Sequence, residues 1–183
     1  LRPPRCRPRG SPCTAIHAPR AAGYFLSMDL LAHYVRIHLT GAAAGLELFG
    51  RGADLHDPEA RATTARIRHE LVEERDWLRG LVKRLGSTEP TLAQVTAKLG
   101  ERLGRLKPNG HLLHRTPLTD VIDLESMHDA LSGKVAGWKA LLEVEGLEEE
   151  RDALERLLAQ GQRQIEQVTD LHRVAARRAW SAT

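Results

Sequence analysis

Apolar residues recur at helical spacing along most of the chain, and the first such stretch covers residues 28–50. At about 100° per residue, one of its faces is apolar and the opposite face is polar. The apolar face consists of Leu31, Val35, His38, Ala42, Gly45 and Phe49. Gly41 and Gly45 are spaced for close approach of a neighbouring backbone, although weak helix propensity is an equally good explanation. We therefore expect an amphipathic first helix over residues 28–50.

A second helix is predicted from Pro58 to Leu85. Asp57 is a typical N-cap residue and Pro58 suits a first turn, whereas Gly86 is typical of a helix end. The predicted buried stripe contains Ile67, Leu71, Glu74, Leu78, Leu81 and Leu85, with Val82 beside it. Glu74 is the polar residue in this stripe, so we expect it to need a partner inside the protein.

Two more helices are predicted in the C-terminal part, from about Leu118 and from about Leu147 to Trp180. The apolar face of the first contains Val121, Leu124, His128, Leu131, Val135, Trp138 and Leu142. The apolar face of the second contains Leu154, Leu157, Leu158, Gly161, Ile165, Val168, His172, Ala175 and Ala179. Gly146 separates the two helices, and a continuous helix through Gly146 would rule out the bundle described next.

The connection between the two pairs of helices, residues 87–117, is longer than most loops. It has its own apolar positions at helical spacing, Leu92, Val95, Leu99, Leu103 and Leu106. We expect a short extra helix there. Two helices, a long connection and two more helices indicate an all-α protein, an antiparallel four-helix bundle with either a ferritin-like or a simple up-down connection.

Composition separates an N-terminal leader from this domain. Residues 1–27 are rich in Arg and Pro, lack periodicity and contain both cysteines, Cys6 and Cys13. We interpret this leader as disordered, either a transit-like segment or the product of an upstream start, and residues 28–183 as one helical domain. The domain then has no thiol for a disulfide or a cysteine-ligated zinc site.

The net charge of +3 does not make the domain basic. The leader contains five arginines and no acidic residue, which leaves 22 basic and 24 acidic residues for the remainder. Interleaved aromatic residues for base stacking are also missing, so nucleic acid is not an expected partner. The chain has neither a secretory core nor an apolar run of membrane-spanning length, and we expect a soluble, cytoplasmic protein without a transmembrane segment.

Five polar residues occupy or flank the predicted apolar stripes and form a candidate metal site. They are His38, Glu74, Glu125, His128 and His172. Carboxylates and imidazoles are the ligands of iron and manganese sites in bundle cores, and the spacing of Glu125 and His128 puts both on one side of a helix. Alternatively, these groups bond to one another and only fix the packing of the helices.

The helix order and the Glu125-x-x-His128 step resemble the ferritin-like superfamily of four-helix bundles. The resemblance implies a carboxylate-bridged Fe or Mn site and an oxidase or oxygen-handling activity. The chain departs from the family pattern on its second helix, where Glu70, Glu73 and Glu74 are not followed by His three residues later. A complete di-iron ligand set is therefore not expected.

Basic residues of the long connection form a second candidate site, for anions. They are Lys98, Arg102, Arg105, Lys107 and Arg115. Such a group suits a phosphate, an acidic partner or an anionic membrane surface, although it is also typical of an ordinary solvated face.

The sequence contains no phosphate-binding loop, nucleophile elbow or zinc-protease motif. We identify no catalytic residues, and we expect a bundle that acts by protein interaction or self-association as a homo-oligomer. A ferritin-like metal-binding protein with a degenerate site and peripheral binding to anionic surfaces are the alternatives.

Overall fold

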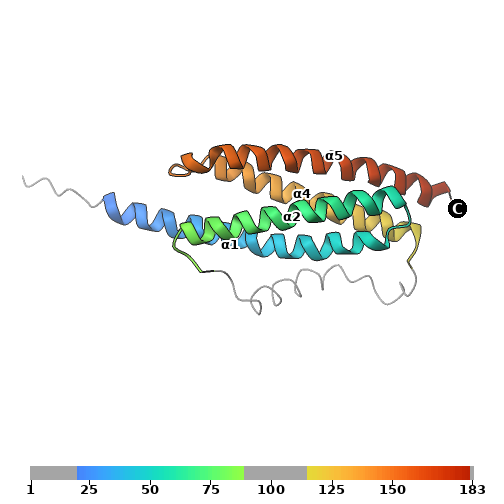
Figure 1. Ribbon diagram of the computed structural model, residues 1–183, viewed down its shortest axis with the longest axis horizontal. Helices are drawn as coiled ribbons and strands as arrows, with labels where there is room; N and C mark the ends of the chain where they lie inside the picture. The colour runs from blue at the N-terminus through green and yellow to red at the C-terminus, as the bar shows by residue number, and fades with distance from the viewer. Residues whose placement is uncertain (1–19, 89–114, 182–183) are drawn as a thin grey trace, which may run out of the picture.

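The computed structural model describes residues 20–88 and 115–181, and every regular element in these ranges is helical. The elements are α1 (Arg20–Gly50), η1 (Arg51–Asp54), α2 (Pro58–Arg84), α4 (Pro117–Leu142), η2 (Glu148–Glu150) and α5 (Arg151–Ser181). The four α-helices lie alongside one another in an elongated molecule (Figure 1), as expected for a four-helix bundle. The predicted short helix around residues 92–106 lies outside the described ranges. Among the described helices, none combines the length and hydropathy needed to cross a membrane.

Helix α1 begins at Arg20, which corrects the predicted start at residue 28. Residues 20–27 were assigned to a disordered leader, yet the structure includes them in the helix. Ala21 and Ala22 are strong helix formers and no proline follows Arg20 before the amphipathic stretch, so nothing stops the helix from extending backwards. Residues 1–19 lie outside the described ranges.

Helix α2 has the predicted bounds and caps. The Asp57 side chain accepts hydrogen bonds from the backbone N–H groups of Glu59 and Ala60, at 2.9 and 3.1 Å. At the other end Gly86 has a φ of 67°, a left-handed conformation that glycine adopts without strain. Local chemistry alone thus determines both ends of this helix.

The predicted break between the last two helices is confirmed at Gly146, whose φ is 93°. The buried face of α4, however, differs from the prediction. Met127 is fully buried, whereas His128 is only partly buried and Glu125 is exposed. The buried face is rotated from the predicted one towards Asp120 and Asp123, which are also buried. A prediction from the hydrophobic pattern cannot include buried carboxylates, because it counts only apolar residues.

The apolar core consists of two clusters arranged along the bundle. One, near the α1–α2 turn, includes Phe49, Leu55, Ile67, Leu71, Leu124, Met127, Leu131 and Val168. The other, towards the α4–α5 turn, includes Val35, Leu78, Leu81, Val82, Trp138, Leu141, Leu147 and Leu154. On α2, α4 and α5 the two clusters are separated by a level that contains Glu74, Lys134 and Gln164.

Close helix packing occurs at glycines other than the predicted pair. Among residues 20–88 and 115–181, no atom of a neighbouring element would lie within 4 Å of a Cβ on Gly41 or Gly45. Gly137 of α4, in contrast, faces the His38 ring of α1, and a Cβ there would lie 2.7 Å from His38 Nδ1. Gly137 therefore allows α1 and α4 to approach at the level of His38.

We predict that Gly137→Ala destabilises the protein, because the added methyl group overlaps the His38 ring. The free energy of unfolding should fall by about 1–3 kcal/mol, as for other overpacked sites. Gly133 of α4 is an exposed helical glycine with open space around it. The control Gly133→Ala should raise the free energy of unfolding by about 0.5–1 kcal/mol. Urea unfolding of both variants measures these changes, and equal effects would contradict the close contact.

Candidate functional site

A buried polar network joins three helices at the level between the two apolar clusters. Glu74 of α2 is 3% exposed, and Lys134 Nζ of α4 lies 2.8 Å from each of its carboxylate oxygens. Lys134 donates a hydrogen bond to Glu74 Oε1, whereas Oε2 is equally close but accepts no hydrogen bond. Lys134 also donates to the side-chain oxygen of Gln164 from α5. We call these three residues the Glu74 network.

The amide of Gln164 completes this network. Its Nε2 donates to Glu70 Oε2 at 2.6 Å and lies 3.3 Å from Glu74 Oε1. Gln160, one turn earlier on α5, donates to the same Glu74 oxygen at 3.3 Å. The buried carboxylate and ammonium therefore both have polar partners, as buried charges require.

Burial is the largest influence on the pKa of both charged groups. It raises the pKa of the Glu74 carboxyl and lowers the pKa of the Lys134 ammonium, because each charge loses hydration. Their mutual attraction opposes both shifts. Removal of one partner would leave the charge of the other buried and unpaired. The loss of either partner alone would therefore lower the free energy of unfolding.

The Glu74 carboxylate does not fit the metal site that the ferritin-like resemblance implies. Its oxygens face the ammonium of Lys134, and this cation occupies the side of the carboxylate where a bridging metal ion would bind. Within residues 20–88 and 115–181, no group of three or more His, Cys, Asp or Glu residues is placed to hold a metal ion.

His38 lies apart from the other predicted ligands. Its ring is partly buried, contacts Gly137 and lies 4.7 Å from the Tyr34 ring, centroid to centroid. Burial lowers the pKa of His38 from its ordinary value of 6.5. The five predicted ligands therefore do not converge: Glu74 and His38 have separate surroundings.

The other three predicted ligands line one pocket on the outer side of α4 and α5. Glu125 Oε1 of α4 lies 3.1 Å from His172 Nε2 of α5. The pocket has a volume of about 370 Å³, and its lining residues are Glu125, His128, Asp129, Thr169 and His172. Glu125 is exposed and the two histidines are partly exposed. The pocket is thus open and polar, in contrast to the dry interior that the sequence predicted.

Apolar side chains are also exposed on the two helices that line this pocket. On α4, Leu118 and Ile122 precede Glu125 at four- and three-residue steps, so the three share a face. On α5, Trp180 follows His172 by two four-residue steps, which places it about 80° around the helix from His172. Leu118, Ile122 and Trp180 are exposed, Trp180 by 63%. We call this surface, with the pocket, the α4–α5 groove.

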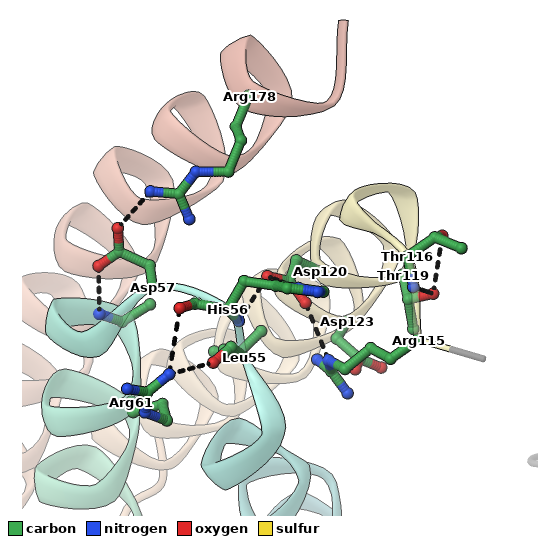
Figure 2. A network of polar contacts seen from close by, with 11 residues as sticks. Leu55, His56, Asp57, Arg61, Arg115, Thr116, Thr119, Asp120, Asp123 and Arg178 are labelled. Carbon is green, nitrogen blue, oxygen red and sulfur yellow. Dashed lines mark hydrogen bonds and ion pairs between the residues drawn. The ribbon is translucent and has the colours of Figure 1, made fainter. Parts of the chain in front are cut away.

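A second polar network lies where the α1–α2 turn meets the start of α4 (Figure 2). Arg115 donates to Asp120 and Asp123, both at 2.9 Å. Asp120 also accepts a bond from the backbone N–H of His56 at 2.9 Å, and Asp123 pairs with Arg51 at 2.9 Å. Figure 2 also shows Arg178 of α5 bonded to Asp57, the N-cap of α2.

This second network changes the interpretation of the candidate anion site. Arg115, one of the five predicted anion ligands, already binds two carboxylates of its own chain. Lys98, Arg102, Arg105 and Lys107 lie outside the described ranges. Asp120 and Asp123 were not among the residues predicted from the sequence. The sequence contained one signal for them. An arginine precedes two acidic residues that lie three positions apart at the start of a helix, where carboxylates are favoured.

Comparisons with protein-family models, with curated proteins and with solved structures found no match. The ferritin-like resemblance thus stays a prediction.

We predict that Lys134→Met lowers the free energy of unfolding by about 3–5 kcal/mol, because the Glu74 carboxylate loses its buried counter-charge. Lys139→Met, on an exposed position of the same helix, is the matched control and should change stability by less than about 0.5 kcal/mol. Adding Glu74→Leu to Lys134→Met should recover at least half of the loss. Urea unfolding of the wild type, the two single variants Lys134→Met and Glu74→Leu, their double variant and the Lys139→Met control measures this coupling, and additive effects of the Lys134 and Glu74 substitutions would contradict a buried pair.

His38 should make stability depend on pH. In the folded protein the pKa of His38 is below its ordinary value of 6.5. As the pH falls through about 6.5, His38 is therefore protonated in the unfolded chain before it is protonated in the folded protein. The free energy of unfolding should therefore fall as the pH decreases from about 7.5 to about 5.5, and His38→Gln should reduce this fall. His33→Gln, on an exposed position of α1, is the control. The account of His38 fails if both variants keep the wild-type pH dependence.

Proposed function

We propose that this protein is a non-catalytic helical bundle that acts through protein contacts, and that the α4–α5 groove is its contact surface. Self-association through this groove is the simplest form of the proposal. The observation that carries it is the exposed set Leu118, Ile122 and Trp180 beside the polar pair Glu125 and His172. Exposed apolar residues around a few polar groups are typical of protein interfaces.

The chemistry of the groove suits an interface. Tryptophan is enriched among the residues that contribute most to binding, and Trp180 is largely exposed in the single chain. Leu118 and Ile122 are 45% and 42% exposed in the single chain, so burying the remainder of each contributes roughly half of the about 1.5–3 kcal/mol for a fully exposed side chain. Glu125 and His172 offer carboxylate oxygens and a ring nitrogen as hydrogen-bonding groups to a polar group of the partner, which favours specificity.

The Glu74 network has a structural role in this proposal. It links α2, α4 and α5 at one level, so that α4 and α5 keep the register in which Glu125 faces His172. Metal binding has less support, because Lys134 occupies the carboxylate that would bridge the ions. Binding of anionic surfaces by Lys98, Arg102, Arg105 and Lys107 stays a prediction.

We also propose that the bundle is antiparallel with a ferritin-like connection. Arg84, the last residue of α2, pairs with Glu150, which directly precedes α5, and Arg178 near the end of α5 pairs with Asp57, the N-cap of α2. These contacts support opposite directions for α2 and α5. The pairing of Arg51 with Asp123 supports the same for α1 and α4. The Arg51–Asp123 pair also places the start of α4 at one end of the bundle, whereas α2 finishes at the other end. This favours a long crossover connection between α2 and α4 over a simple up-down order.

We predict that the wild-type protein self-associates and that Trp180→Asp weakens the association at least tenfold, about 1.4 kcal/mol. Ile122→Asp should have the same effect. Val174→Asp is the matched control, since Val174 is an exposed apolar residue of α5 on a different side from His172. Sedimentation velocity over a range of concentrations measures the association. A monomer at all concentrations would refute self-association, and equal effects of the three substitutions would refute the groove as the interface.

A further inference from the structure

The pocket in the α4–α5 groove contains two side chains whose polar atoms are typical zinc ligands. Glu125 Oε1 and His172 Nε2 lie 3.1 Å apart. In a tetrahedral zinc site, Zn–N and Zn–O bonds of about 2.0–2.2 Å place neighbouring ligand atoms about 3.3 Å apart. The Glu125–His172 pair therefore matches one edge of the coordination tetrahedron of a zinc ion. This pair is separate from Glu74, whose carboxylate is occupied by Lys134.

Both ligands are accessible, and both come from rigid elements. The side chains of Glu125 and His172 are 57% and 31% exposed and line an open pocket of about 370 Å³. They come from α4 and α5, which pack against each other and are held in register by the hydrogen bond between Lys134 and Gln164. In the single chain the imidazole N–H donates to the carboxylate, and a bound zinc ion takes the place of this proton.

One chain supplies only half of such a site. Zinc sites in proteins are almost always four-coordinate when they are structural. In the part of the chain that the structure describes, no third His, Cys, Asp or Glu is placed to complete a metal site with this pair. His128 and Asp129 line the same pocket without converging on the same point as the pair. Two further ligands have to come from solvent or from another molecule.

A second copy of the chain supplies the missing ligands by symmetry. In a twofold dimer the same surface of both subunits forms the interface. Where the axis passes through the groove, each Glu125–His172 pair faces its own copy, and an ion on the axis has two imidazole nitrogens and two carboxylate oxygens as ligands. Ile122, exposed and one turn before Glu125, excludes water from this contact, which strengthens the electrostatic attraction at the ion.

We propose that the α4–α5 groove binds one zinc ion that is shared between two copies of the chain. The proposal rests on the proposed function, because it places the metal in the self-association interface. It names a ligand that neither subunit can hold alone. Association of the two copies and binding of the ion are then coupled, since each provides what the other needs.

Sedimentation velocity of the chelator-treated full chain, with and without added Zn²⁺, tests the shared site. We expect Zn²⁺ to bind at one ion per two chains and to tighten the dimer at least tenfold. His172→Gln removes one ligand from each chain and should abolish the zinc effect, measured against the metal-free association of the same variant. His69→Gln is the matched control, because His69 and Glu73 form an exposed His/Glu pair within α2. This variant should keep the full response to zinc.

The outcomes separate the shared zinc site from the proposed interface. One zinc ion per chain on a monomer, a zinc effect that survives His172→Gln, or association that does not respond to zinc would each overturn the inference. Association without zinc that Trp180→Asp weakens would support the groove as an interface even then. A dimer that forms only with zinc and is lost in His172→Gln would support the shared site and refute association by apolar contact alone.

Cobalt in place of zinc reports the coordination directly. Co²⁺ in a four-coordinate protein site absorbs visible light much more strongly than hydrated Co²⁺. We expect this absorption to saturate at one Co²⁺ per two wild-type chains and to be absent in His172→Gln. Saturation at one ion per chain, or equal absorption in the wild type and His172→Gln, would show that the groove does not share an ion between two copies.

Discussion

The ion pair between Glu74 and Lys134 is the constraint on which the arrangement of the bundle depends. It lies between two apolar clusters that could, on hydrophobicity alone, tolerate a shift of one helix along another. A shift by one turn would separate the carboxylate from the ammonium by about 5 Å in a medium that hydrates neither. Gln164 extends the same constraint to α5. Buried charges are weak sources of stability, but in this bundle they distinguish one register from its neighbours.

The two polar networks of the protein have different structural roles because they differ in burial and in position along the bundle. In the Glu74 network, Glu74 and Gln164 are buried and Lys134 is partly buried, and the network connects the middle of three helices. In the second network, buried Asp120 and Asp123 bind the Arg51 and Arg115 guanidinium groups and the His56 ring, all of which are at least partly exposed. These contacts hold the α1–α2 turn against the first turn of α4, where the helix dipole also favours carboxylates. One network sets register and the other closes an end of the bundle.

The sequence predicted the features that depend on local chemistry. The caps of α2 at Asp57 and Gly86, the break at Gly146 and the burial of Glu74 all follow from neighbouring residues or from helical period. The features it did not predict depend on other helices. Lys134 and Gln164 are residue types that usually lie on the surface of a protein. They are recognised as partners of Glu74 only when α2, α4 and α5 are placed side by side. The rotation of α4 buries Met127 in place of His128. It goes with the burial of Asp123, which pairs with Arg51 and Arg115, two residues outside α4.

Nuclear magnetic resonance of protein labelled with ¹⁵N-lysine tests the central ion pair most directly. If Lys134 is buried and bonded to Glu74 and Gln164, its ammonium protons exchange slowly with water, give a resolved signal near neutral pH and show a through-space contact to the Gln164 side-chain amide. The exposed Lys139 on the same helix gives no such signal. Exchange of the Lys134 ammonium as fast as that of Lys139 would contradict the account.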